Sequence, residues 1–567
     1  MAVENLITEH TDIWTSAVKT KSTSGRGSSK KLELYGVKKL RELILELAVR
    51  GKLVPQNPND EPASFLLQRI SEEKTQLIKE KKITKPKKLP AIKKQDITFA
   101  LPEGWQACYF GDIYSLVYGD NLPKAKRTES GEFLVYGSNG SVGTHNLFSV
   151  GSPCLVIGRK GSAGAINLSD QPCWVTDVAY SLIPPVGISL KYCFLHLQTL
   201  GLDSLGKGIK PGLNRNEANA LVVCIPPSDE QHRIVAKVDE LMALCDQLEQ
   251  QTEASIEAHQ VLVTTLLDTL TNSADADELM QSWARISEHF DTLFTTEESI
   301  DQLKQTILQL AVMGKLVPQD PSDEPAAELL KRIAEEKAQL VKEKKIKKQK
   351  ALPPISEDEK PFELPSGWEW CHLNSLISEM DAGWSPACPP EASPNHETWG
   401  VLKTTAVQNM EYREYENKVL SSSKEPRPQY EVKNGDILIT RAGPKNRVGV
   451  SCLVQTTRPK LMISDKIIRF HLIELGMSNN FVSLCLNAGA TSEYLESSKS
   501  GMAESQMNIS QDKLKMAPIP LPPIREQTLI AKKVEELIDL CDKLKLSLEK
   551  GKHAHFQFTD SVIEQAV

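Results

Sequence analysis

Two proline pairs and one glycine-rich segment come nearest to a catalytic motif in this sequence. Ile225–Ser228 (IPPS) and Leu521–Ile524 (LPPI) contain the Pro-Pro of an amino-methyltransferase signature, but they lack its Asp or Asn before the prolines and its aromatic residue after them. Gly158–Gly164 (GRKGSAG) does not have the spacing of a dinucleotide-binding fingerprint, and no GxxxxGKS/T phosphate-binding loop occurs. No histidine or cysteine cluster has the spacing of metal ligands. The sequence therefore predicts no catalytic residue and no metal site.

Polar side chains on glycine-rich turns are the other candidate functional residues. They occur in YGSNGSVG (Tyr136–Gly143), GRKGSAG and GDILITRAG (Gly435–Gly443). Residues 100–224 and 363–520, which contain these turns, lack helical periodicity and alternate short apolar runs with turn signals. We expect both stretches to be β-rich, with basic and amide side chains projecting from their loops.

Similar sequence segments, which we call phrases, precede and follow each of the two β-rich stretches. Ala48–Ala63 (AVRGKLVPQNPNDEPA) returns as Ala311–Ala326 with three of sixteen positions changed, 263 residues later. Ile225–Leu248 returns as Leu521–Leu544, 296 residues later. The two offsets differ because the second β-rich stretch is about 33 residues longer. The same flanking segments, which we call the frame, thus occur twice and enclose two dissimilar β-rich stretches, which we call the inserts.

The repeated phrases predict helices. Leu40, Ile44 and Leu47 lie on one helical face, Gly51 ends that helix, and a proline-rich elbow leads to a second helix from about Ala63. The second phrase has apolar residues spaced four and three apart, as in a coiled-coil seam. A central helix over about 229–270 would be roughly 60 Å long, enough to hold the two inserts apart.

Length, charge and cysteine content set the class of protein. A chain of 567 residues predicts about three or four domains. The net charge of −7 excludes a uniformly basic surface but permits local basic patches. Eleven scattered cysteines without a CxxC pair predict reduced thiols and a cytoplasmic location. The sequence has neither an apolar run long enough for a membrane span nor a secretory signal at its start.

Basic segments occupy equivalent places in the two halves. Lys81–Lys94 and Val341–Lys350 each follow the second elbow helix. Two interpretations are equally supported: each segment is a solvated helix end, or each segment contacts DNA phosphates. Near the start of the chain, the Ser/Gly/Lys-rich segment within residues 1–36 predicts a flexible linker.

Internal duplication predicts a pseudo-twofold axis. B-DNA has a local dyad, and proteins with twofold symmetry read half-sites about 34 Å apart. Because the two inserts differ in sequence, the two half-sites should differ as well. The frame would then set the spacing, and the inserts would set the sequence that is read.

The GKLVPQ elbows, the PPxxEQ starts of the long helices and the LPxGW segments resemble the specificity (S) subunit of type I restriction–modification systems. The resemblance covers nearly the whole chain from about Val37. It implies a non-catalytic subunit that binds a two-part sequence in double-stranded DNA and recruits two methyltransferase (modification) subunits, which restriction subunits then join. S-adenosylmethionine, ATP and Mg²⁺ would belong to the partner subunits, and this chain would carry no cofactor.

The predicted fold is α+β, with two β-rich target-recognition domains separated by long antiparallel coiled-coil helices in a pseudo-twofold internal repeat. The predicted division is an N-terminal extension or linker (1–36), an N-terminal helical repeat (37–95), the first target-recognition domain (96–227), a central helical region (228–350), the second target-recognition domain (351–523) and a C-terminal helical repeat (524–567).

Candidate DNA contacts are Arg, Lys, Asn, Gln, Ser and Thr residues on loops of the inserts, because these side chains address base edges and phosphates. In the first insert they are Lys124, Lys126, Arg127, Ser138, Asn139, Arg159, Lys160, Lys207, Lys210 and Arg215. In the second they are Lys403, Thr404, Arg441, Lys445, Arg447, Lys499 and Gln506. For each residue taken alone, a solvated loop side chain is the alternative interpretation.

The near-identity of the two elbows predicts that two copies of one partner dock at equivalent places. We expect Leu53, Val54, Leu316 and Val317 to line these two docking sites. A different class of function stays open: a two-armed protein-binding scaffold without DNA specificity, whose basic segments serve solvation only. Salt-dependent DNA binding would separate the two hypotheses.

Overall fold

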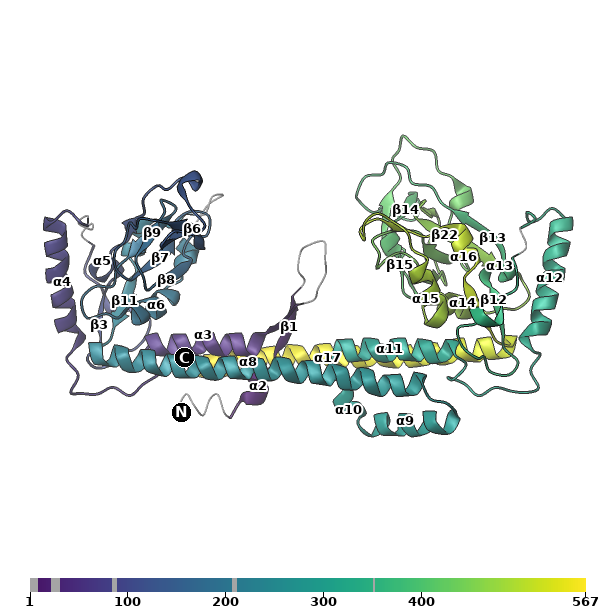
Figure 1. Ribbon diagram of the computed structural model, residues 1–567, viewed down its shortest axis with the longest axis horizontal. Coiled ribbons are helices and arrows are strands. Elements are labelled where there is room, and N and C mark those ends of the chain that lie inside the picture. Colours follow the sequence, from purple (N-terminus) through teal and green to yellow (C-terminus); the bar gives the residue numbers. More distant parts are fainter. Residues whose placement is uncertain (1–8, 22–30, 84–88, 206–211, 350–351, 567) are drawn as a thin grey trace. The chain divides into compact units, whose positions relative to one another are not determined.

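The computed structural model describes residues 9–21, 31–83, 89–205, 212–349 and 352–566 (Figure 1). By their internal contacts, residues 1–256 and 551–567 form one compact unit (unit 1), and residues 257–550 form another (unit 2). Each unit contains one β-rich domain and segments of both long helices. The predicted candidates Lys207 and Lys210 lie outside the described residues.

In unit 1, helix α3 (Tyr35–Val49) lies antiparallel to the first part of α8 (Ser228–Thr271). Arg41 in α3 pairs with Asp246 in α8 at 2.7 Å, while Gln56, after the end of α3, donates to Glu230 near the start of α8 at 3.2 Å. The end of α17 (Ile524–Ala566) returns to the start of α3, where Tyr35 donates to Asp560. Helix α4 (Ala63–Lys79) follows the elbow.

Unit 2 repeats this helical frame. Helix α11 (Glu297–Val312) lies antiparallel to the first part of α17, with a Lys304–Asp542 ion pair at the position of Arg41–Asp246. Helix α12 (Ala326–Lys342) corresponds to α4. The end of α8 packs beside α11, as the end of α17 packs beside α3, and Gln260 donates to Glu298. The predicted helical frame and its internal duplication are confirmed.

The β-rich domain of unit 1 consists of small sheets. A four-stranded sheet has the order β4-β10-β7-β8, a three-stranded sheet has the order β6-β5-β9, and β3 pairs with β11. The bounds are β3 (Gln106–Tyr109), β4 (Val117–Tyr118), β5 (Phe133–Gly137), β6 (Gly140–His145), β7 (Cys154–Gly158), β8 (Ile166–Ser169), β9 (Cys173–Val175), β10 (Ala179–Leu182) and β11 (Val222–Ile225), with helices α5 (Phe110–Ile113), α6 (Leu190–Gln198) and α7 (Arg215–Asn219).

The β-rich domain of unit 2 has the same topology. Its sheets have the orders β13-β22-β18-β20, β17-β14-β21 and β12-β24, and in both domains the middle strand of the three-stranded sheet has one parallel and one antiparallel neighbour. The bounds are β12 (Glu369–His372), β13 (Ile377–Ala382), β14 (Gly400–Leu402), β17 (Asn417–Val419), β18 (Ile437–Thr440), β20 (Ser451–Leu453), β21 (Leu461–Met462), β22 (Ile467–Leu472) and β24 (Pro518–Leu521), with helices α13 (Leu373–Leu376), α14 (Asn479–Cys485), α15 (Gly489–Ser497) and α16 (Gln511–Lys515). The two dissimilar inserts are therefore versions of one fold.

Some elements occur once. Helices α9 (Ala276–Glu288) and α10 (Phe290–Leu293) connect α8 to α11 in unit 2. Near the N-terminus, α2 (Thr11–Ser16) precedes strands β1 (Val18–Lys21) and β2 (Lys31–Leu34), which pair antiparallel. The predicted linker is therefore flanked by a strand pair, and its residues 22–30 lie outside the described residues. The division of the chain into the six segments predicted from the sequence stays a prediction.

A buried carboxylate ties elbow, β-rich domain and long helix together in each unit. Glu230 is 1% exposed and accepts hydrogen bonds from Trp105 Nε1 (3.1 Å) and Gln56 Nε2 (3.2 Å). Glu526, 2% exposed, accepts the same bonds from Trp368 (2.9 Å) and Gln319 (3.1 Å). Burial raises the pKa of both carboxyl groups above the ordinary value. This network explains why the GKLVPQ, LPxGW and PPxxEQ phrases recur together.

A lysine of the flanking helix, buried in unit 1 and partly buried in unit 2, supports each β-rich domain. Lys74 on α4 donates to the carbonyl oxygens of Gly111 (2.7 Å) and Tyr114 (3.0 Å), and Lys337 on α12 donates to that of Asn374. Burial lowers the pKa of each ammonium group to about 8. Helix α4 and helix α12 each lie beside the β-rich domain of their own unit (Figure 1), and each donates a lysine hydrogen bond to it.

Glu230→Gln is expected to reduce the free energy of unfolding by about 1–3 kcal/mol at neutral pH. A carboxylate offers two acceptor oxygens, whereas the amide places an N–H₂ donor against Trp105 or Gln56. Burial raises the pKa of the Glu230 carboxyl group in the folded state above its value in the unfolded state, so the folded state binds more protons. The contribution of Glu230 to stability is therefore largest below the unfolded-state pKa and is lost as pH rises through the folded-state pKa. Urea titrations of both proteins at pH 5 and 8 should show a larger difference at pH 5. An equal difference at both pH values would contradict the account.

Candidate nucleic-acid interface

Arg159 and Arg441 occupy the same place in the two β-rich domains, directly after β7 and β18. The backbone N–H of Arg159 donates to Val178 (2.9 Å), and its carbonyl accepts from Leu213 (2.8 Å). Arg441 makes the equivalent bonds with Lys466 (2.8 Å) and Ile509 (2.9 Å). Both arginines were sequence candidates, and their equivalence emerges only from the fold.

In the first domain, the turns before β6 and after β7 lie against each other. A Cβ on Gly158 would meet the Ser138 carbonyl oxygen at 2.4 Å, so the two turns approach through a position that only glycine fits. This brings together Ser138, Arg159 and Lys160. The backbone of Lys160 forms an isolated antiparallel β-bridge with Gly212, three residues before Arg215. In the described part of the chain, Arg159, Lys160 and Arg215 have no carboxylate partner. They form the first basic cluster.

The remaining described candidates of the first domain lie before β5 and in the turn between β5 and β6. Lys124 and Lys126 are exposed on a single 3₁₀ turn. Arg127 is half-buried and donates to the Leu122 carbonyl oxygen at 3.0 Å. Asn139 is exposed in the turn between β5 and β6.

In the second domain, Arg441 has an incomplete hydrogen-bond set. Among the described residues, its buried Nε has no partner. Lys445 is 50% exposed, and its nearest carboxylates, on Glu504 and Glu496, lie at 3.7 and 4.0 Å. An acceptor such as a base edge or a phosphate could therefore be bound here. Arg441 and Lys445 form the second basic cluster.

Neighbouring candidates of the second domain are engaged within the protein. Arg447 donates to Gln408 at 2.8 Å. The Lys499 side chain is only 6% exposed, pairs with Glu496 and donates to the Lys445 carbonyl oxygen, so it holds the turn instead of presenting a cation. Gln506 is exposed, just before β23 (Met507–Asn508), which pairs with β19 (Ala442–Gly443) beside Arg441.

Lys403 and Thr404 lie apart from that turn, after β14. Lys403 is half-buried and faces Glu416 at 3.6 Å. Thr404 begins a 3₁₀ turn. The structure gives them no contact with the second basic cluster.

The four apolar elbow residues belong to the protein's own cores. Leu53 is 7% exposed within the core of unit 1, and Val54 packs against the same core. Leu316 and Val317 pack against the core of unit 2. Intramolecular packing therefore accounts for much of their apolar surface. The exposed elbow positions are instead the prolines and polar residues that follow, including Pro58 and Pro321.

The two basic segments begin at helix ends. Lys81 after α4 and Lys344 after α12 have positive φ angles of 61° and 56°, the left-handed geometry of a helix terminus. Lys82 and Lys345 then pair with Glu80 and Glu343. At these residues the helix-end interpretation applies, and residues 84–88 and 350–351 lie outside the described residues.

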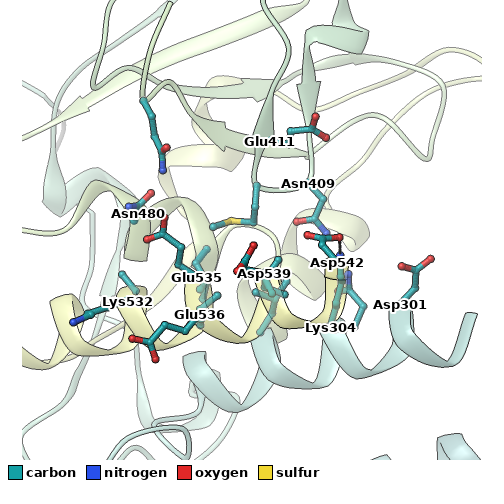
Figure 2. Close-up of a pocket in the computed structure, with 18 residues that line it drawn as sticks. Asp301, Lys304, Asn409, Glu411, Asn480, Lys532, Glu535, Glu536, Asp539 and Asp542 are labelled. Atoms are coloured by element: carbon teal, nitrogen blue, oxygen red, sulfur yellow. Dashed lines mark hydrogen bonds and ion pairs between the residues drawn. The ribbon is translucent and has the colours of Figure 1, made fainter. Parts of the chain in front are cut away.

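A cavity of about 840 Å³ in unit 2 has the wrong charge for DNA (Figure 2). It lies between α11, α14, α17 and the turn after β15 (Val407–Gln408). Two lysines, Lys304 and Lys532, face six carboxylates: Asp301, Glu411, Glu535, Glu536, Asp539 and Asp542. This excess of negative charge repels phosphates, so the cavity is not part of the proposed interface.

A buried charge network within the second domain was missed by sequence reasoning. Arg469 on β22 contacts Asp381 on β13 at 3.0 Å and Asp436 at 3.5 Å. Asp436, 1% exposed, also bonds His471 Nε2 at 2.6 Å. No spacing in the sequence signals this set, because the strands that carry it are brought together only by the sheet.

His471→Gln is expected to remove a pH dependence from the stability of the second domain. The hydrogen bond to Asp436, with the charges of Asp436 and Glu379, raises the pKa of His471 above 6.5, although burial and Arg469 oppose this. The resulting stabilisation is fully present below pH 6.5 and is lost as pH rises through the folded pKa. Unfolding of both proteins at pH 6 and 8.5 tests this, and parallel pH profiles would contradict it.

In the part of the chain that the structure describes, no group of three or more His, Cys, Asp or Glu side chains could hold a metal ion. Within the same residues, no helix is both long and apolar enough to cross a membrane.

Comparison with known proteins gives consistent matches. A family model for the type I restriction modification DNA specificity domain matches residues 102–258 and 400–550. The type I restriction enzyme EcoEI specificity subunit of Escherichia coli is 52% identical over 603 residues, and the EcoAI specificity subunit of Escherichia coli is 40% identical over 610 residues; both alignments cover 100% of each chain. A crystal structure of a type I restriction–modification S subunit from M. genitalium matches 83% of this chain and 98% of its own, at 12% identity and a TM-score of 0.26.

Proposed function

This chain belongs to the family of type I restriction–modification specificity subunits, and from this premise we propose that its β-rich domains each read one half of an asymmetric, two-part DNA sequence. DNA recognition is the role of the family. The β-rich domains, over residues 96–227 and 351–523, are its two target-recognition domains.

One observation carries the proposed assignment of one half-site to each domain. The two domains share a topology and place Arg159 and Arg441 at equivalent strand ends, yet the side chains around these arginines differ. The shared topology places the two arginines in the same way, and the different side chains around them select different bases. Arginine can bond guanine bidentately, and the lysines beside each arginine suit phosphates. The proposed base-reading residues are therefore Arg159 and Arg441.

The partners proposed for this chain are two modification subunits and, through them, restriction subunits. The duplicated elbows support two docking sites, because both carry the same Gln–Glu–Trp network and nearly the same exposed sequence. We assign methyl transfer and DNA cleavage, with S-adenosylmethionine, ATP and Mg²⁺, to those partners and no catalytic step to this chain. The complex would act in the cytoplasm.

The protein-scaffold hypothesis makes a different prediction about salt. Phosphate contacts release counterions, so the affinity of the assembled complex for cognate duplex should fall steeply with salt concentration. A protein-binding scaffold whose basic segments serve solvation only would show no such salt-dependent binding of DNA. Membership of the family favours the DNA-reading function.

Pro58→Glu and Pro321→Glu are each expected to remove one of two bound modification subunits. Both prolines are exposed, at equivalent elbow positions, and Glu is compatible with the turn position. Native mass measurement of the assembled complex should give two modification subunits for the wild type, one for each single variant and none for the double variant. Two bound subunits in both single variants would contradict the elbow assignment, and thermal unfolding of the variants controls for misfolding.

A further inference from the structure

The aromatic ring of Tyr118 joins two cations of the first target-recognition domain. The guanidinium carbons of Arg159 and Arg215 each lie 5.1 Å from the centroid of this ring. Arg159 follows β7 and Arg215 begins α7, so two separate elements deliver charge to one ring. Tyr118 itself is 50% exposed.

The position of the ring is fixed by its own surroundings. Tyr118 packs on Tyr180 with centroids 5.0 Å apart, and the buried Tyr180 is anchored by a hydrogen bond from its hydroxyl to the Leu213 carbonyl oxygen at 3.1 Å. The next residue, Gly119, has no room for a side chain, because a Cβ there would meet the Thr176 carbonyl oxygen at 2.2 Å. The backbone on both sides of the ring is therefore held against β10 and β9.

We propose that Tyr118 is a positioning residue for DNA recognition, which holds Arg159 and Arg215 together on the face of the first target-recognition domain. The negative face of an aromatic ring attracts guanidinium groups and offsets the repulsion between them. Arg159 is held further by donating to the Asp177 carbonyl oxygen at 2.6 and 3.1 Å. Two arginines ordered before DNA arrives lose less side-chain entropy on binding.

The second target-recognition domain lacks this arrangement. In its sheet Ala382 pairs with Ile468, where the first domain pairs Tyr118 with Tyr180. Arg441 therefore has no equivalent ring at this strand position. Two consequences follow: loss of the Tyr118 ring should affect only the half-site read by the first domain, and the strand tolerates a small side chain at this position.

Tyr118→Leu and Tyr118→Phe separate positioning by the ring from simple packing. The inference rests on the proposed function, so both variants are compared with the wild-type chain in complex with its modification subunits. Cognate duplex and duplexes with single base changes in either half-site are the probes. We expect Tyr118→Phe to bind within about twofold of wild type, because the ring remains, and Tyr118→Leu to lose about tenfold in affinity.

Discrimination between bases is the decisive readout. Tyr118→Leu should discriminate less against base changes in one half-site and as well as wild type in the other, and Tyr118→Phe should restore the lost discrimination. Wild-type affinity and discrimination in Tyr118→Leu would overturn the inference, as would equal losses in both variants or lost discrimination in both half-sites. If the wild-type complex itself does not discriminate cognate DNA, the proposed function fails and the inference fails with it.

Discussion

Arg469→Met is expected to destabilise the second target-recognition domain by about 3–5 kcal/mol, the usual cost of leaving a buried charge without its partner. The Arg469 side chain is 9% exposed and balances Asp381 and the fully buried Asp436. It also donates to the carbonyl oxygens of Glu431 (2.7 Å) and Gln429 (2.9 Å), which would lose these bonds. Urea unfolding of the purified chain measures the loss, and methylation should fail because one half-site is no longer read.

A charge-matched control separates charge from packing. The double variant Arg469→Met with Asp436→Asn removes the buried anion together with its cation, so it should recover part of the lost stability. Ser181, at the position in the first domain equivalent to Arg469, shows that the topology itself does not require this network. Equal stability of wild type and Arg469→Met would contradict the prediction, and so would a double variant less stable than the single one.

Arg441→Ala is expected to weaken binding of the cognate sequence by about 1–3 kcal/mol, roughly fivefold to more than a hundredfold, and to relax specificity in one half-site. Arg159→Ala should have the same effect on the other half-site. Base contacts act on discrimination, whereas phosphate contacts act on all sequences alike. Competition binding with duplexes changed at each position of the cognate site measures both effects.

Lys445→Ala provides the matched control for Arg441→Ala. Lys445 lies on the same turn but suits a phosphate, so its loss should weaken cognate and altered sequences equally and reduce the salt dependence of binding. If Arg441→Ala weakened all sequences equally, Arg441 would be a phosphate contact. If Arg159→Ala and Arg441→Ala relaxed the same half-site, the assignment of one half to each domain would be wrong.

The helical frame was predictable because it depends on local and repeated signals. Apolar spacing predicted the helices around Leu40 and along the two long segments, and Gly51 with φ of 67° ends α3 as expected. The duplicated phrases predicted the internal repeat. Their reason became clear only in the structure, where Glu230 and Glu526 connect parts of the chain that are far apart in sequence.

The common fold of the two inserts could not be predicted from the sequence. Their strands are short, and the order β4-β10-β7-β8 depends on pairings between distant segments that leave no periodic pattern. The candidate residues show the same limit. Glycine-rich turns correctly located Arg159 and Arg441 on loops, but residue type alone could not separate the exposed Lys445 from the covered Lys499, nor show that Leu53 faces the core.

Tyr118 shows what kind of residue sequence reasoning overlooks. A tyrosine in an apolar run predicts a buried strand position, and nothing nearby in the sequence indicates the two arginines on its ring. Arg159 and Arg215 reach it through β7 and α7, which the sheet and the bridge at Gly212 bring together.

Methylation mapping with a domain exchange tests the central claim most directly. Strands β3 and β11 pair with Gln106 opposite Ile225, so the first target-recognition domain begins and ends at adjacent points and residues 107–224 can be replaced as a block by those of a relative. Cells carrying the wild-type chain with its modification subunit should show one methylated motif of two defined parts and an unspecific gap. The exchanged chain should change one part and keep the other, with the same gap. A change in both parts, or an unchanged motif, would contradict the account that each domain reads its own half.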